Sequence, residues 1–173
     1  MFYWNGTTMV TIAPGTTGQT LTYCSGVPTL GPCPVHIGDS YQGGIVFYIL
    51  QSSDPGYDAN LQHGFIAATA DQCQNTGIQW SNGSSVWTST ENTALGTGSA
   101  NTTAIINIQG VGNYAASICR NYNGGGYNDW FLPSKDELYK LYLNQGVVGG
   151  FNGNNTGVLP RPANSSFGFS TSP

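Results

Sequence analysis

Hydrophobic residues are concentrated in two segments near the middle of the chain, and both segments have the pattern of buried β-strands. Residues 45–50 read Ile-Val-Phe-Tyr-Ile-Leu, and residues 64–69 read Gly-Phe-Ile-Ala-Ala-Thr. Short continuous apolar runs that are rich in β-branched and aromatic residues are typical of such strands. Because the stretch between them is polar, we expect the two to pair as antiparallel neighbours, with residues 78–80 as a short third strand candidate.

Helical patterns are few and short, and the clearest one begins at Ser134. The run Ser134-Lys135-Asp136-Glu137 is a capping box, in which the serine hydroxyl and the glutamate carboxylate satisfy backbone amides at the start of a helix. A stripe of apolar residues follows at Leu138, Leu141 and Tyr142, and the helix is expected to end near residue 144. Residues 104–108, capped by 101–103, and residues 114–120 predict two further helices.

The remaining segments are rich in Gly, Ser, Thr, Asn and Pro, which predicts long loops. Residues 82–100 are expected to form one loop, and the chain returns to this composition after Gly146. The last residues, 167–173, show no pattern of a closing strand.

The first 36 residues contain only short strand-like pieces, at residues 9–12 and 19–23. Neither piece is long enough to bury a core of its own. We therefore interpret residues 1–36 as a connector or stalk segment that lies on the main domain or on copies of itself, and residues 37–173 as the head domain.

The composition is polar but nearly uncharged. Only 7% of the residues are charged, and the formal net charge is -4 with a sequence pI of about 4.6. A chain without a basic stripe is not suited to bind nucleic acid or anionic membrane surfaces. The 4 Trp, 10 Tyr and 7 Phe supply the large apolar side chains that disordered chains lack, so we expect a folded, loop-rich domain.

No targeting or membrane segment is recognisable in the sequence. The longest apolar run, residues 44–50, is far shorter than the roughly 18 residues that span a bilayer. The N-terminus has neither the basic region nor the apolar region of a secretion signal. We expect either a fragment of an exported protein or a protein that reaches the outside by another route, such as on a virion.

Four cysteines at positions 24, 33, 73 and 119 lack the CxxC spacing of zinc or thioredoxin-like sites. Cys24 and Cys33 flank a turn-rich stretch that could close a small loop, which leaves Cys73 to pair with Cys119. Four cysteines allow three pairings, and four buried free thiols are the alternative. We predict the disulfides Cys24–Cys33 and Cys73–Cys119.

No catalytic signature or cofactor motif is present, so we expect a protein that is not an enzyme. His36 and His63, the only histidines, stand in no recognisable hydrolase or metalloprotease motif. Asp136 and Glu137 are explained by the start of a helix. The run Gly124-Gly125-Gly126 leads into Tyr127 rather than into a phosphate-binding loop, and it reads as a tight turn.

Calcium is the one candidate metal, because hard cations bind oxygen ligands. Asn128 and Asp129 are adjacent in a predicted turn and could both donate oxygens, with Glu91 or Asn92 as distant partners. The alternative is that Asn128 and Asp129 are turn residues that bond their own backbone.

Aromatic residues interleaved with amide side chains are the most suggestive feature for binding. Sugars bind to such surfaces because the apolar face of the ring lies on an aromatic plane while its hydroxyls bond amides. The alternative for Trp80 and Trp130 is that these two side chains lie in the core. The candidate ligand-binding residues are Trp87, Asn121, Tyr122, Asn123, Tyr127 and Asn128.

Two stretches resemble the C-terminal domain family of the Legionella collagen-like adhesin. The first is residues 37–48 followed by residues 63–68, Asp71-Gln72 and Trp80. The second, residues 129–138, reads Asp-Trp-Phe-Leu-Pro-Ser-Lys-Asp-Glu-Leu and is similar to the most specific signature of that family. The resemblance covers roughly residues 37–144. Residues 5–7, 14–21 and 26–32 also resemble connector repeats of bacterial surface proteins and phage tail fibres.

The resemblance implies an α+β, C-type-lectin-like fold: a small twisted antiparallel sheet, two or three short helices and long loops. It also implies an extracellular, glycan-binding protein that forms trimers on a stalk, with Trp130, Leu132 and Leu138 fixing the signature helix to the sheet. The family normally ends in a closing strand, so the head domain is expected either to be truncated or to be completed by a neighbouring copy. Sulfated polysaccharides need cations, and the chain has only Arg120, Lys135, Lys140 and Arg161, so neutral sugars fit better.

We therefore expect a carbohydrate-binding adhesion or receptor-binding head of a cell-surface or virion protein. Its partner would be a glycan or a host-surface receptor, and it would form a homotrimer, without nucleic acid or membrane insertion. The alternative is a purely structural subunit of a spike, fibre or extracellular filament. An enzyme of the formylglycine-generating type, which has a similar fold, is a weaker third option that a Cys73–Cys119 bridge would remove.

Overall fold

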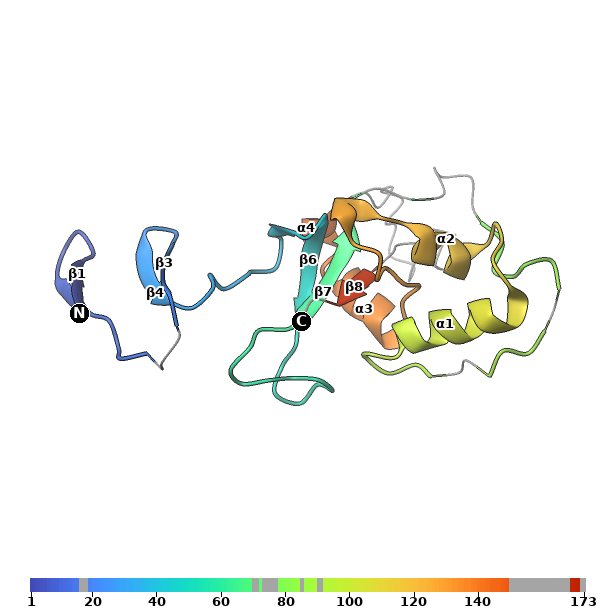
Figure 1. Cartoon of the computed structure of the whole chain (residues 1–173), viewed down its shortest axis with the longest axis horizontal. Helices are drawn as coiled ribbons and strands as arrows, with labels where there is room; N and C mark the ends of the chain where they lie inside the picture. The colour runs from blue at the N-terminus through green and yellow to red at the C-terminus, as the bar shows by residue number, and fades with distance from the viewer. Residues whose placement is uncertain are drawn as a thin grey trace. The chain divides into compact units, whose positions relative to one another are not determined.

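The computed structural model describes residues 1–15, 19–69, 72, 78–84, 86–89, 92–149 and, for the backbone alone, 169–171. The chain divides into two compact units, Met1–Val35 and His36–Pro173. Figure 1 gives the order of the elements.

The first unit consists of two separate antiparallel hairpins. β1 (Phe2–Trp4) pairs with β2 (Met9–Thr11), and β3 (Leu21–Cys24) pairs with β4 (Val27–Leu30). The strand-like patterns of the sequence thus correspond to β2 and β3, whereas β1 and β4 were not predicted. Two-stranded hairpins of three or four residues bury little apolar surface.

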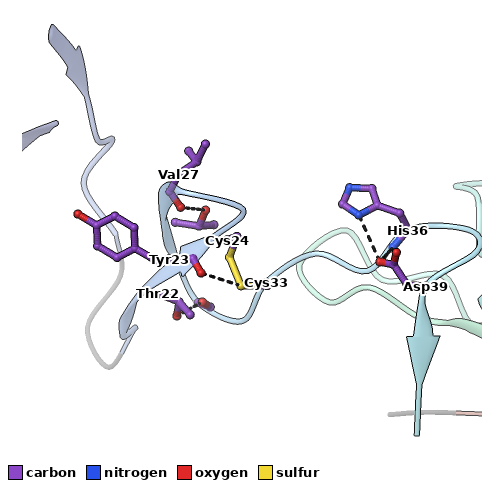
Figure 2. Close-up of a disulfide and its surroundings, with 9 residues drawn as sticks. Thr22, Tyr23, Cys24, Val27, Cys33, His36 and Asp39 are labelled. Atoms are coloured by element: carbon purple, nitrogen blue, oxygen red, sulfur yellow. Dashed lines mark hydrogen bonds and ion pairs between the residues drawn. A yellow bond between two sulfur atoms is a disulfide. The ribbon is translucent and has the colours of Figure 1, made fainter. Parts of the chain in front are cut away.

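A disulfide closes the second hairpin, as predicted. It joins Cys24, the last residue of β3, to Cys33, and the two Cα atoms lie 5.3 Å apart (Figure 2). The Thr22 hydroxyl also donates to the carbonyl oxygen of Gly31 at 2.5 Å, which joins the start of the same hairpin to the residues after β4. The disulfide is compatible with an oxidising compartment.

The second unit is built around a four-stranded antiparallel sheet with the order β5-β6-β7-β8. The strands are β5 (Ser40–Tyr41), β6 (Gly44–Ile49), β7 (Gly64–Ala68) and β8 (Phe169–Thr171). The predicted antiparallel pairing of the two apolar segments is confirmed: β6 and β7 pair from Gly44 opposite Ala68 to Ile49 opposite Gly64, with a register shift between Val46 and Tyr48.

The expectation of a missing closing strand is wrong. β8 pairs antiparallel with β7, with Phe65 opposite Thr171 and Ala67 opposite Phe169. The chain's own residues therefore close this side of the sheet. This strand could not be recognised from the sequence, because three residues are too few to show an alternating pattern.

Four α-helices and one 3₁₀ turn are present in the part of the chain that the structure describes. They are α1 (Gly98–Gln109), α2 (Ala115–Asn121), the 3₁₀ turn η1 (Gly124–Gly126), α3 (Lys135–Leu143) and α4 (Gln145–Val148). The capping box at Ser134 is confirmed, and η1 occupies the predicted glycine turn. The short helix α4 lies where loop was expected.

Helix α1 begins earlier than its sequence indicates. Residues 82–100 were expected to be loop, yet α1 already starts at Gly98, with Thr97 as its N-cap. A side chain at Gly98 would meet the Glu137 carboxylate and the Phe131 ring. Glycine is therefore required there by the close approach of α3, and a glycine at a helix start reads as loop when the sequence is considered alone.

The core of the second unit lies between β6, β7 and residues 131–141. Its buried residues include Phe47 and Phe65, whose rings stack with centroids 6.1 Å apart, together with Phe131 and Leu141. The predicted core position of Trp130 is confirmed, because this side chain is fully buried. Among the described residues, no helix is both long enough and apolar enough to cross a membrane.

The third strand candidate is not a strand. Residues 78–80 have no strand pairing, and Trp80 is 68% exposed. The backbone of this stretch is instead bonded to a helix, because the Ala115 amide donates to the Gln79 carbonyl oxygen at the start of α2.

Candidate functional site

A buried glutamate, Glu137, joins α3 to the loop that precedes α1. The Glu137 side chain is fully buried, and its Oε1 accepts hydrogen bonds from the amides of Gly96 at 2.8 Å and Gly98 at 3.4 Å. Its Oε2 accepts from the Ser134 amide at 2.6 Å. Backbone amides thus solvate a carboxylate that would otherwise be costly to bury.

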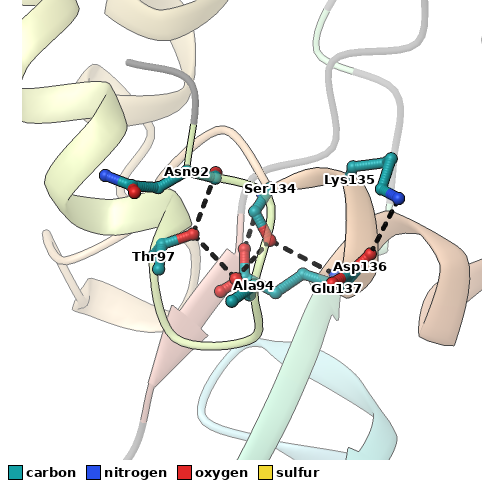
Figure 3. Close-up of polar contacts among 7 residues, drawn as sticks. All are labelled: Asn92, Ala94, Thr97, Ser134, Lys135, Asp136 and Glu137. Carbon is teal, nitrogen blue, oxygen red and sulfur yellow. Dashed lines mark hydrogen bonds and ion pairs between the residues drawn. The ribbon is translucent and has the colours of Figure 1, made fainter. Parts of the chain in front are cut away.

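Ser134 and Thr102 extend this connection on either side. The Ser134 hydroxyl donates to the Ala94 carbonyl oxygen at 2.8 Å (Figure 3) and accepts from the Glu137 amide. The buried Thr102 hydroxyl donates to the Gly98 carbonyl oxygen at 2.8 Å and accepts from the Leu132 amide at 2.9 Å. We call these bonds among residues 94–102 and 132–137 the signature clamp.

The predicted binding residues after α2 form one continuous surface segment. Asn121, Asn123, Tyr127 and Asn128 are exposed, and Tyr127 is only moderately so, at 39%. Tyr122 is half-buried because its ring packs edge-on against Trp130, with centroids 4.9 Å apart. Tyr122 therefore offers only part of its surface to a ligand.

This segment is held on the sheet through a close approach of glycines. A side chain on Gly43, which has a φ of +85°, would come within 2.4 Å of the Gly125 Cα. The Trp130 indole Nε1 donates to the Gly124 carbonyl oxygen at 3.2 Å, and Trp130 also lies against Gly44. The turn that presents Tyr127 and Asn128 thus rests directly on the β5–β6 hairpin.

Trp87 lies on a different loop and is 76% exposed. That loop is bonded to the C-terminal end of α1, where the Asn82 amide donates to Gln109 Oε1 at 2.8 Å. It is bonded again at the N-terminal end of α1, where Asn101 Nδ2 donates to the Asn92 carbonyl oxygen at 2.7 Å. The predicted ligand-binding residues are therefore distributed over two loops.

The helices between these loops are joined by Arg120. Its guanidinium donates to the Ser99 carbonyl oxygen at 3.2 Å and to the Thr103 hydroxyl at 3.0 Å, so the end of α2 lies beside the first turns of α1 (Figure 1). The guanidinium of Arg120 is thereby directed to α1.

The candidate calcium ligands have one notable feature. Asp129 Oδ1 is buried and has no hydrogen-bond partner among the described residues, whereas the neighbouring Asn128 is exposed. No group of three or more His, Cys, Asp or Glu side chains suited to a metal occurs among the described residues, and Glu91 lies outside them. Asn128 and Asp129 remain a prediction as metal ligands.

The remaining residues considered in the sequence are two cysteines and the two histidines. Cys119 is buried in α2, while Cys73 lies outside the described residues, so their disulfide stays a prediction. His36 Nδ1 lies 3.4 Å from Asp39 Oδ2 at the surface (Figure 2). His63 is half-buried just before β7.

A polar cluster at the end of β6 fixes the start of the loop 51–63. The Tyr48 hydroxyl donates to Asp54 Oδ2 at 2.6 Å, the Gln51 amide donates to the same oxygen at 2.7 Å, and Lys140 Nζ lies 4.4 Å from the centre of the Tyr48 ring. Burial raises the pKa of Tyr48, and the bond to Asp54 raises it further. Burial acts to raise the pKa of Asp54, but the bonds from Tyr48 and Gln51 and the charge of Lys140 outweigh it, so this pKa lies below 3.8.

The sequence did not reveal an open hollow of about 280 Å³ beside the signature clamp. It lies where the first turns of α1, the loop before it and the residues before α3 come together. Its lining residues are Asn92, Thr93, Asn101, Thr102, Ile105, Leu132, Pro133, Ser134 and Lys135.

Comparison of this chain with protein-family models, with curated proteins and with solved structures found no match.

Proposed function

We propose that this protein is a non-enzymatic, carbohydrate-binding head domain of a cell-surface or virion assembly, with a C-type-lectin-like fold. The fold proposal rests on the sequence resemblance and is compatible with a small antiparallel sheet flanked by helices and long loops. The binding surface would consist of the Trp87 loop and the segment 121–128.

The observation that carries the proposal is the exposure of Trp87. A side chain of this size is 76% exposed in a loop that is rich in Ser, Thr, Asn and Gly. Leaving so large an apolar surface in water is unfavourable, whereas a sugar ring would cover it and bond the neighbouring hydroxyls and amides. Tyr127 and the exposed amides of Asn121, Asn123 and Asn128 offer the same combination.

Neutral glycans are the preferred ligand class. The second unit carries all of the chain's Lys and Arg, and Arg120 and Lys140 are already engaged with Ser99 and Tyr48. A cation-poor surface gives little attraction to sulfate or carboxylate groups. Calcium, if bound at Asn128 and Asp129, would add a contact to sugar hydroxyls.

We further propose that the protein is a homotrimer and that residues 1–36 are its connector. The hairpin β1–β2 leaves Phe2, Trp4 and Met9 more than 60% exposed, and residues 1–35 contain no Lys, Arg, Asp or Glu. Copies of such a segment can associate without charge repulsion and would cover one another's apolar side chains.

A structural subunit of a spike, fibre or filament is the second candidate, and the same exposed hairpins favour it. The two candidates differ in the head domain. A structural subunit would use Trp87 and Tyr127 in contacts with other subunits, whereas a lectin would use them to bind sugar.

A glycan array probed with the purified oligomer, in calcium and again in chelator, tests the proposal. We expect binding to neutral glycans that is reduced by Trp87→Ala and by Tyr127→Ala. Tyr139→Ala is the matched control, because Tyr139 is an exposed aromatic residue on α3 and is not among the proposed binding residues. Absence of binding in both conditions would contradict the lectin proposal and favour the structural subunit.

A further inference from the structure

The hollow beside the signature clamp has walls from three segments that are distant in the sequence. One wall is the N-terminal half of α1, with Asn101, Thr102 and Ile105. The second is Asn92 and Thr93, and the third is the stretch from Leu132 to Lys135. None of the residues 121–128 is among its lining residues.

These walls are fixed by hydrogen bonds within the protein. Asn101 Nδ2 donates to the Asn92 carbonyl oxygen at 2.7 Å, and the Asp136 amide donates to the Thr93 carbonyl oxygen at 3.0 Å. The Thr102 hydroxyl accepts from the Leu132 amide at 2.9 Å, which joins the remaining two walls. A hollow that is held in shape without a ligand binds at a lower entropic cost than a surface that must be ordered.

The lining combines apolar and polar side chains. Ile105, Leu132 and Pro133 supply the apolar part, and Asn92, Thr93 and Asn101 supply amides and a hydroxyl. Within the described residues, the side chains of Asn92 and Thr93 have no hydrogen-bond partner, so their polar groups are available to a ligand. A ligand that fits this lining has one apolar face and several hydroxyl groups.

The charge of the lining argues for a neutral ligand. Lys135 is its only charged residue, and Lys135 Nζ lies 3.3 Å from Asp136 Oδ1. Figure 3 shows this ammonium group turned toward Asp136, on the opposite side of the clamp from the Asn92 side chain. The one positive charge is therefore offset by its neighbour.

We propose that this hollow is a second binding site and takes a single neutral pyranose ring. Its volume of about 280 Å³ lies just below the roughly 300–1,000 Å³ of small-molecule sites, which suits one ring and not an extended chain. The ring would lay its C–H face on Ile105 and Pro133 and direct hydroxyls to Asn92 and Thr93. The choice of a sugar rests on the proposed function, whereas the position of the site rests on the hollow alone.

Ligand-observed NMR with methyl glycosides of neutral hexoses and N-acetylhexosamines, at millimolar concentration and with the full chain, tests the proposal. We expect at least one of these glycosides to bind, and its affinity to fall at least tenfold in Ile105→Phe, which fills the hollow. Asn92 is exposed, and its side chain makes no hydrogen bond among the described residues. Asn92→Ala should weaken binding of the glycoside about three- to tenfold. Ile108→Phe and Asn107→Ala are the matched controls on α1, since neither residue lines the hollow, and both should bind as the unmodified chain does.

The outcomes separate this site from the aromatic loops. Trp87→Ala and Tyr127→Ala should leave binding of the monosaccharide unchanged, even if they abolish binding on a glycan array. Binding that survives both Ile105→Phe and Asn92→Ala, or no binding of any monosaccharide, would overturn the proposal. Stronger binding of methyl glucuronide than of methyl glucoside would overturn the choice of a neutral ligand. A silent array together with binding in the hollow would refute the proposed function and leave this site standing.

Discussion

Glu137 Oε1 lies 2.8 Å from the amide nitrogen of Gly96, a residue 41 positions earlier in the chain. This bond, together with those from Gly98 and Ser134, fixes the loop before α1 to the start of α3. Because the carboxylate is fully buried, its two oxygens have only these amides to replace water. This side chain therefore helps to hold α1 in position, together with the bonds of Thr102 and Asn101.

Replacement Glu137→Gln should therefore be strongly destabilising. A glutamine places an NH₂ group against amide donors on one side and leaves at least one buried N–H without an acceptor. We expect the free energy of unfolding to fall by about 2–4 kcal/mol. Chemical denaturation, monitored by tryptophan fluorescence, measures this free energy of unfolding.

The control for this substitution is Asp136→Asn, at the preceding residue in the same helix turn. Asp136 is partly exposed and bonds only Lys135 among the described side chains, so its loss should cost less than about 1 kcal/mol. Equal losses in the two variants would show that Glu137 acts only through the helix dipole and not through the signature clamp.

The cluster of Tyr48, Asp54 and Lys140 predicts how stability depends on pH. Asp54 has a pKa below 3.8, so its contribution to stability is present above that pH and is lost as the pH falls through the lower folded value. Tyr48 and Lys140 have raised pKa values, so their contribution is complete below about pH 10 and is lost as the pH rises further. The melting temperature should decline at both extremes.

Substitution Asp54→Asn isolates the acidic limb of this dependence. The variant should melt below the unmodified chain at pH 7, and the difference should shrink as the pH is lowered below 3.8. Asp58→Asn serves as the control, because the Asp58 carboxylate bonds only Asn60, two residues later, among the described residues. A difference that stays constant between pH 7 and pH 2 would refute the assigned role of Asp54.

The disulfide Cys24–Cys33 should be the main source of order in the second hairpin. It closes a loop with a sequence separation of 9, for which the chain-entropy estimate is about 2–3 kcal/mol. We expect the double variant Cys24→Ser/Cys33→Ser to become sensitive to proteases within residues 21–33 while the head domain stays intact. Limited proteolysis with mass spectrometry reads this out, and an unchanged cleavage pattern would contradict it.

The exposed hairpin β1–β2 predicts the state of assembly. Replacement of Phe2 and Trp4 by Ser removes most of the apolar surface that a neighbouring copy would cover. We expect the unmodified chain to sediment as a trimer. The dissociation constant of the trimer, measured by analytical ultracentrifugation, should be at least tenfold higher in the double variant. A monomeric unmodified chain would refute the assembly proposal.

The sequence was sufficient where the signal is local. The apolar runs of β6 and β7, the capping box at Ser134 and the loop closed by Cys24 and Cys33 are each encoded by residues close together in the chain. In each case the hydrophobic pattern, the cap or the turn residues specify the structure without help from distant contacts.

The sequence was insufficient where distant segments decide. Gly98 reads as loop because the reason for it, the buried Glu137 carboxylate, is in another helix. β8 is defined by its pairing with β7 and not by its own pattern. The hollow is assembled from three separate segments, none of which contains a recognisable motif.

The central claim is that the exposed aromatic side chains of the head bind neutral sugars, and titration of a neutral glycan into the purified oligomer tests it most directly. The glycan would be the strongest neutral hit on the array, titrated calorimetrically into the unmodified chain, Trp87→Ala and Tyr139→Ala. The account predicts saturable binding that weakens at least tenfold in Trp87→Ala and is unchanged in Tyr139→Ala. Binding that is equal in all three proteins, or no glycan bound at all, would contradict it.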